Sequence, residues 1–241
     1  MIHYLSQPHK SKCDDFNFEI GFMTDDEKFY NEVDTCIREI IAKYGNKNIE
    51  NKPGNYCEII HIDNNELDKI NKYCNYPVIN PEELFVFSFK LCDNEIDDDN
   101  EYFSVSALHE LVRLFRGKKG FVADGIFARI YDTELINGLS YQYTKNDIPY
   151  KWIRAKAYMV CSNEKVIKEI KAGIRKEISI SCSTFDKRCS ICGNKVGSCP
   201  HHKGDIYKNG GRCYTSIETV TDAYEWAFTE PPSPSKSLKG E

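Results

Sequence analysis

The alternation of hydrophobic and polar positions divides the chain into a series of short elements. Near the amino terminus, apolar residues recur at helical spacing after Thr24 and Glu27, which fit a capping box, until Gly45 ends the pattern. Similar spacing predicts three further helices, at 67–73, 104–117 and 166–174. Runs rich in β-branched and aromatic residues predict strands at 56–62, 84–92, 121–131, 150–160, 176–183 and 223–229.

Two of the predicted strands differ in their pattern. The run from Leu84 to Cys92 is almost continuously apolar, as expected of a strand that is buried on both faces. The run at 176–183 alternates instead, with three serines on one face: Ser179, Ser181 and Ser183. Strands dominate and the helices are interspersed, so we expect an α+β fold with a mixed barrel or sheet rather than a repeating βαβ unit.

Composition and charge exclude several classes of protein. Hydrophobic residues make up 41% of the 241 residues, enough for a packed core, so fibrous and fully disordered chains are excluded. The net charge of -5 lacks the excess of positive charge typical of a general nucleic-acid binder. No apolar run approaches the roughly 20 residues that cross a bilayer, and residues 1–8 lack the apolar core of a signal peptide. We therefore expect a cytoplasmic protein that binds no membrane.

The 11 cysteines fall into two groups. Seven are scattered among apolar neighbours, and we interpret them as buried thiols. The other four lie in one short stretch with two histidines, a composition typical of a metal site: Cys189, Cys192, Cys199, His201, His202 and Cys213. Reduced surface thiols without a metal are the alternative, but so dense a cluster would oxidise easily.

The spacing of Cys189 and Cys192, with a glycine directly after them, is that of a zinc knuckle. Because tetrahedral Zn²⁺ takes four ligands, we expect this pair to be joined by two of Cys199, His201 and Cys213. His202 is then a bystander. No open position or general base is evident, so we expect a structural ion. The stretch is also basic, but no aromatic platform for nucleic acid accompanies the charges.

Five segments of the chain occur in an order that resembles a known family: Glu83–Ser88, Leu91–Asp97, Ala128–Glu134, Ala172–Ser183 and Asp222–Phe228. They are similar to the prohead (capsid maturation) proteases of tailed phages and prophages of Gram-positive bacteria, including a subgroup with a zinc-knuckle insertion. The resemblance implies a herpesvirus-assemblin-like β-barrel with flanking helices. It also implies a serine endopeptidase that digests scaffold and trims capsid protein inside the immature head.

The resemblance points to three candidate catalytic residues, two by a role in the family and one by its position. The family's nucleophile falls on Ser179, and an acidic residue of the last strand falls on Glu225. The family's catalytic histidine has no counterpart, because Asp124 lies near its place. His109 precedes it on a helix, where we expect a partly buried structural histidine. A carboxylate is a much weaker base than imidazole, so we expect an inactive enzyme.

The expected organisation has four parts. Residues 1–65 form an amino-terminal α/β extension, residues 66–185 and 214–232 form the protease-like barrel, residues 186–213 form the zinc-knuckle insertion, and residues 233–241 form a disordered tail. The first hypothesis is a phage or prophage head-assembly protein, with capsid and scaffold proteins as partners and self-association into a homo-oligomer as an option. The second hypothesis is a non-enzymatic, zinc-stabilised module that binds a different partner.

Overall fold

The computed structural model of the protein describes residues 10–13, 16–19, 54, 56–140, 142–207 and 210–229. The chain divides into two units, residues 1–50 and 51–241. The first unit contains an antiparallel pair of strands, β1 (Lys10–Cys13) and β2 (Phe16–Glu19). The helix predicted at 24–45 and the tail predicted at 233–241 lie outside the described residues.

The described part of the second unit contains one sheet of eight strands and three α-helices, which confirms the predicted α+β class. The strands are β3 (Cys57–Ile59), β4 (Leu84–Asp93), β5 (Glu101–Phe103), β6 (Lys119–Ala123), β7 (Ile126–Asn137), β8 (Lys151–Val160), β9 (Ile178–Cys189) and β10 (Thr215–Phe228). The helices are α2 (Asn64–Asn71), α3 (Val105–Leu114) and α4 (Glu164–Lys171), with a 3-10 turn, η1, at Pro81–Glu83. Within the residues described, no helix is long and apolar enough to cross a membrane.

The sheet does not close into a barrel, so the barrel predicted from the resemblance is wrong. Its strand order is β3-β4-β8-β7-β6-β10-β5, and β9 pairs with the other side of β10. Closure would require β9 to pair with the far end of the sheet, at β3 or β4. Among the described residues β9 pairs only with β10, and β3 occupies part of the outer edge of β4 at Phe87–Phe89.

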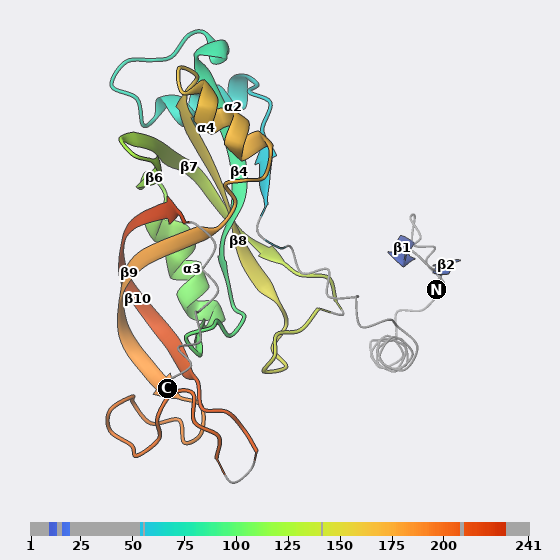
Figure 1. Ribbon diagram of the computed structural model, residues 1–241, viewed down its shortest axis with the longest axis vertical. Helices are drawn as coiled ribbons and strands as arrows, with labels where there is room; N and C mark the ends of the chain where they lie inside the picture. The colour runs from blue at the N-terminus through green and yellow to red at the C-terminus, as the bar shows by residue number, and fades with distance from the viewer. Residues whose placement is uncertain are drawn as a thin grey trace, which may run out of the picture. The chain divides into compact units, whose positions relative to one another are not determined.

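Aromatic side chains fill the space between β4 and β10 where a barrel would close. The rings of Phe89 and Trp226 have centroids 4.6 Å apart, and Phe87 and Phe228 pack beside them. The rings sit in the main core together with Leu108 and the other apolar residues of α3. Figure 1 shows α3 beside β10, with α2 and α4 toward the opposite end of the sheet from the 190–214 loop. Strands β4 and β10 are therefore held together by side-chain packing and not by backbone hydrogen bonds.

Local sequence signals explain where several elements begin and end. The Ser104 hydroxyl caps α3 by accepting a hydrogen bond from the Ala107 amide at 3.2 Å. Strand β4 is buried along almost its whole length, as its continuous apolar run predicts. The strand predicted at 121–131 is instead a hairpin, β6 and β7, because Asp124 and Gly125 form a two-residue turn in which Gly125 has φ 67°.

Two further predictions need correction. The apolar helix face predicted at 166–174 includes Ile174, but α4 ends at Lys171 and Gly173 turns the chain with φ 69°, which leaves Ile174 exposed. His109 was expected to be partly buried. It lies instead on the exposed side of α3, because Leu108 and Leu111 take the buried side.

Candidate metal centre and serine strand

The cysteine-rich stretch, residues 186–213 and called the metal loop below, leaves and rejoins the sheet at one point. Cys189 ends β9 and lies opposite Thr215, the first residue of β10. Hydrogen bonds continue just beyond this pair, since the Ser190 amide donates to the Tyr214 carbonyl at 3.0 Å. The two long strands thus form a ribbon that carries the loop at its lower end in Figure 1.

The first two predicted ligands are brought together by a tight turn. The Gly193 amide donates to the Cys189 carbonyl at 2.8 Å, and the Cys189 amide donates to the Asn194 carbonyl at 2.9 Å. Gly193 has φ 72°, a conformation that glycine adopts without steric cost. This turn places the Cys189 and Cys192 sulfurs on the same side, as a zinc knuckle requires.

Four of the predicted ligands form one group: Cys189, Cys192, Cys199 and His201 each offer a ligand atom, and these atoms all lie within 4.8 Å of one another. The Nδ1 atom of His201 is buried without a hydrogen-bond partner among the described residues. A buried nitrogen without a partner is costly unless something else binds it. The His201 ring is held edge-on by Tyr207, with centroids 4.7 Å apart. His202 is exposed and is not part of the group.

Cys213 is a fifth sulfur at the edge of the group. It is buried, and its Sγ lies 3.7 Å from the Sγ of Cys189. Burial raises the pKa of the Cys189 thiol, but hydrogen bonds from the backbone amides of Ile191 and Cys192 outweigh burial and lower this pKa to about 6. Burial and the Cys189 sulfur raise the pKa of Cys213 to about 11. Of the two sulfurs, the surroundings favour the thiolate form at Cys189 and the thiol form at Cys213.

The donor set fits a metal ion. The nine cysteines from Cys57 to Cys213 are all free, so none of these sulfurs is held in a disulfide. Three thiolates and one imidazole suit a borderline-soft divalent ion in tetrahedral coordination. The loop could therefore hold a metal ion at Cys189, Cys192, Cys199 and His201.

The structure places the predicted nucleophile and its acidic partner on one exposed face of the β9–β10 ribbon. Ser179 lies opposite Ala227, and Glu225 lies opposite Ser181. Ser179 and Glu225 are therefore diagonal neighbours, a relation in which the Cα atoms are about 7–8 Å apart. Among the described residues, no hydrogen bond joins the Ser179 hydroxyl to any side chain.

Asp124, the third predicted residue, is not brought to Ser179. Strand β10 separates β9 from β6, and β6 lies beside β10 with Phe121 opposite Ala227. Asp124 follows three residues later, in the turn between β6 and β7. The Cα atoms of Asp124 and Ser179 are therefore far apart. They are separated by two strand spacings of about 4.8 Å each across the sheet and by three residues of about 3.3 Å each along the strand.

His109 lies on the wrong side of the sheet to serve Ser179. Helix α3 packs with Leu108 and Leu111 in the main core, against the inner face of β10 that carries Trp226. Ser179 is exposed on the other face of β9, because its neighbours Ile178 and Ile180 turn inward to that core. No histidine of the described residues is hydrogen-bonded to the serine face.

Comparison with known proteins gave no match: no protein-family profile, no curated protein and no solved structure is significantly similar to this chain.

An ion-pair centre that the sequence did not indicate connects the metal loop to the sheet. The Glu101 carboxylate on β5 accepts from Lys203 at 2.9 Å and from Lys187 at 3.5 Å. These lysines and the positive charges they carry lower the pKa of Glu101 against the raising effect of its burial. Glu101 is one of several acidic residues between 93 and 101, so only the fold distinguishes it from its neighbours.

Proposed function

We propose that the protein is a non-catalytic head-assembly component of a tailed phage or prophage, related to the prohead proteases but without their peptidase activity. The relation is supported by the five ordered segments that resemble the family. The observation that carries the loss of activity is the serine face of β9. Ser179 is exposed there with Glu225 as a diagonal neighbour, and neither Asp124 nor His109 lies beside it.

A serine endopeptidase needs a base within hydrogen-bond reach of the nucleophile and a third group that orients this base. Removing the histidine of such a triad costs about a million-fold in turnover, because an unassisted hydroxyl is a poor nucleophile at neutral pH. Asp124 is too far from Ser179 to act as a substitute in this arrangement. The proposed role is therefore to bind capsid or scaffold protein in or on the immature head, in the cytoplasm of the bacterial host.

We further propose that the metal is a structural Zn²⁺ ion. Cys189, Cys192, Cys199 and His201 are the four ligands, because their donor atoms form one group and His201 Nδ1 has no other partner. Cys213 then donates its S–H to the Cys189 sulfur instead of binding the ion. A structural zinc of this type stabilises its own loop and takes no part in a reaction.

Co-expression with the major capsid protein and scaffold of the same phage tests this proposal. We expect both proteins to remain at full length and at least one of them to co-purify with this chain. Serine-directed phosphonates should not label the protein. Cleavage that is lost in Ser179→Ala but kept in Ser181→Ala, which changes the next serine on the same face, would refute inactivity.

The same experiment tests a second candidate, a zinc-stabilised binding module that acts outside head assembly. One observation speaks for this candidate. Of the two predicted sites, the metal group is the one whose side chains come together among the described residues. A protein that contains one equivalent of zinc but co-purifies with neither capsid nor scaffold would support the second candidate over the first.

A further inference from the structure

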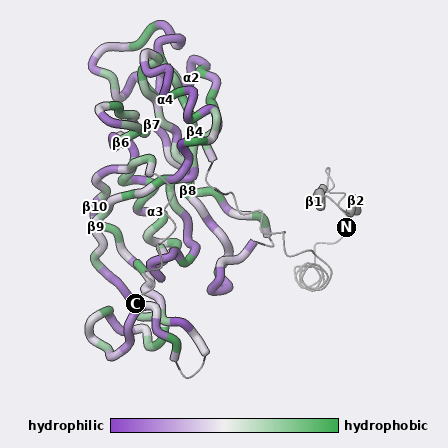
Figure 2. The backbone as a smooth tube through the Cα atoms, viewed as in Figure 1, coloured by the Kyte–Doolittle hydropathy of each residue, from purple (hydrophilic) through white to green (hydrophobic). Residues whose placement is uncertain are grey.

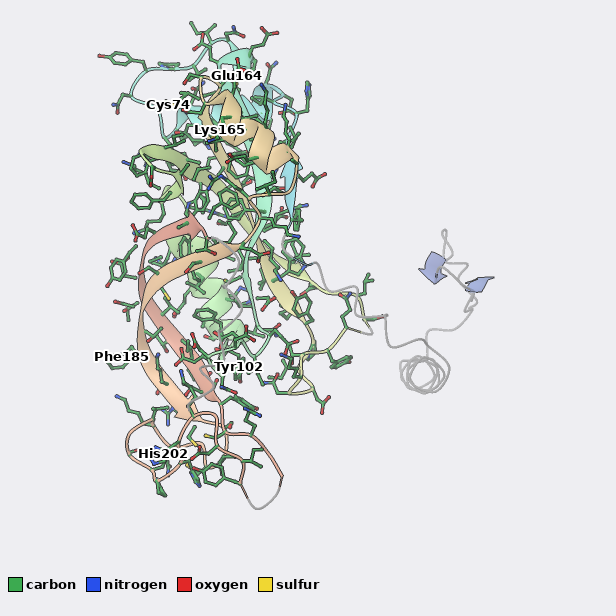
Figure 3. All side chains as sticks on the ribbon, viewed as in Figure 1. Cys74, Tyr102, Glu164, Lys165, Phe185 and His202 are labelled. Carbon is green, nitrogen blue, oxygen red and sulfur yellow. The ribbon has the colours of Figure 1, made fainter. Side chains whose placement is uncertain are left out.

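The metal loop and the part of β9 just before it expose large apolar side chains. Phe185, on the last part of β9, is 69% exposed, and Ile206 and Val196 in the loop are 68% and 46% exposed. Figure 3 labels Phe185 at the outer side of β9, above His202 of the loop. The Lys195 ammonium lies 5.2 Å from the centre of the Phe185 ring.

These side chains are displayed on a fixed backbone. An isolated bridge pairs Arg188 with Lys195, and the Val196 amide donates to the Lys187 carbonyl at 2.9 Å. On the other half of the loop, a second bridge pairs Ile206 with Arg212. A binding surface that is ordered before it meets its partner loses little conformational entropy on binding.

The loop differs in charge from the rest of the chain. Residues 186–213 carry six basic and two acidic side chains, while the other residues carry 26 basic and 35 acidic side chains. The three thiolates and Zn²⁺ together add one negative charge, so the loaded loop remains positive. Figure 2 shows hydrophilic and hydrophobic stretches next to each other along this loop. An acidic partner is therefore repelled by most of the molecule and attracted to the loop.

The ion pairs of the loop decide which class of partner fits. Arg188 is held by Asp186 at 2.8 Å, and Lys187 and Lys203 are held by Glu101. Lys195 and Arg212 have no ion pair among the described residues. Two available cations suit a protein segment with a few carboxylates, whereas nucleic acid is bound through many phosphate contacts and through stacking on aromatic rings. Phe185 supplies one ring, while Val196 and Ile206 are aliphatic, so these side chains offer no series of rings on which successive bases could stack.

We infer that the metal loop is a docking surface for an acidic protein segment that also carries apolar side chains. The apolar side chains cover Phe185, Val196 and Ile206, and the carboxylates pair with Lys195 and Arg212. This inference rests on the metal-ordered loop proposed above and does not require the head-assembly role.

Fluorescence anisotropy tests the inference with three labelled probes and the zinc-loaded protein. The probes are a 16-residue peptide of Glu, Leu and Phe, the same peptide with Ser in place of Leu and Phe, and a 20-nucleotide oligo(dT). We expect the first probe to bind at least tenfold more tightly than the other two. Phe185→Ser and Lys195→Glu should each weaken its binding at least tenfold. Tyr76→Ser, which changes a side chain 86% exposed between α2 and η1, is the matched control and should have no effect.

Several results would overturn the inference. These are tighter binding of oligo(dT), equal binding of the two peptides, or unchanged binding by Phe185→Ser. Sedimentation of the protein alone tests a second copy as the occupant, and a dimer that Phe185→Ser dissociates would also overturn it. Native mass spectrometry of each sample separates the two proposals: a zinc-free protein contradicts the metal centre, whereas a zinc-loaded protein that fails to bind the peptide contradicts the docking surface alone.

Discussion

Replacing Cys192 by Ser should unfold the metal loop and leave the sheet intact. The reason is that the loop has almost no apolar core of its own. Between Cys189 and Cys213, all described residues lie outside both hydrophobic clusters. Exposed apolar residues such as Ile206 cannot stabilise the loop, because they do not leave water.

The magnitude follows from the contacts that the loop does make. Ordering the 21 described residues between Cys189 and Cys213 costs at least about 1 kcal/mol each, or about 21 kcal/mol in all. Ten backbone hydrogen bonds among the described residues involve this segment, and at about 1 kcal/mol each they return about 10 kcal/mol. The remaining 11 kcal/mol or so lies within the roughly 10–16 kcal/mol that a structural zinc contributes. The other contacts of the described segment are side-chain contacts such as the Lys203–Glu101 pair, and an ion pair near the surface contributes only about 0–1 kcal/mol.

Hydrogen–deuterium exchange measured by mass spectrometry is the direct assay. In Cys192→Ser, the amides of 190–207 should lose their protection, while those of β4 and β8 should keep it. Cys161→Ser removes a half-buried thiol directly after β8 and should change neither zinc content nor exchange. Loop amides that stay protected in zinc-free protein would refute the energetic reasoning. Loss of protection in β4 as well would show that the loop is integral to the core.

Two further predictions concern the sheet. Gly120→Ala places a Cβ atom 2.1 Å from the ring of buried Trp226, so we expect urea denaturation to show a free energy of unfolding that is lower by about 1–3 kcal/mol or more. Gly54→Ala is the control and should change the free energy of unfolding little, because nothing lies within 4 Å of the added Cβ atom. The Glu66 carboxylate is buried, which raises its pKa, but hydrogen bonds from Tyr131, Lys156 and Lys69 outweigh burial and lower this pKa below its usual value. Its stabilising effect is therefore complete above about pH 5 and is lost as the pH falls through the lowered pKa. In Glu66→Gln, the urea midpoint should be lower at pH 7 and should fall less between pH 5 and 3; a parallel fall in both proteins would contradict this reasoning.

Local patterns were enough to predict the elements whose burial is simple. The continuous apolar run of β4 predicts that both of its faces are buried, and Ser104 predicts the cap of α3. The hairpin of β6 and β7 was missed although the Asp124-Gly125 dipeptide is a direct signal for it. The full lengths of β9 and β10 could not be read from alternation, because register shifts near Thr219 and Glu225 break the period-two pattern.

Properties that depend on distant parts of the chain could not be predicted from local patterns. Closure of the sheet depends on whether β9 pairs with β3 or β4, which lie far before it in the chain. The metal group was predicted from spacing, since Cys189 and Cys192 lie on one turn. The sequence did not decide which two of Cys199, His201 and Cys213 complete the group, because this depends on where the returning half of the loop places each donor atom.

Motion of α3 cannot restore a base to Ser179. To bring His109 to the outer face of the ribbon, α3 would have to leave the core and expose Leu108, Leu111 and Phe115, all fully buried. Exposing three such side chains costs roughly 2 kcal/mol each at the least, or about 6 kcal/mol together. Each 1.4 kcal/mol or so corresponds to a factor of ten, so such a conformer would account for about one molecule in 10⁴. Even a fully competent triad in that conformer would turn over about 10⁴-fold more slowly than a preformed one. Among the described residues, the absence of a histidine beside Ser179 is therefore a property of the fold and not of one conformation.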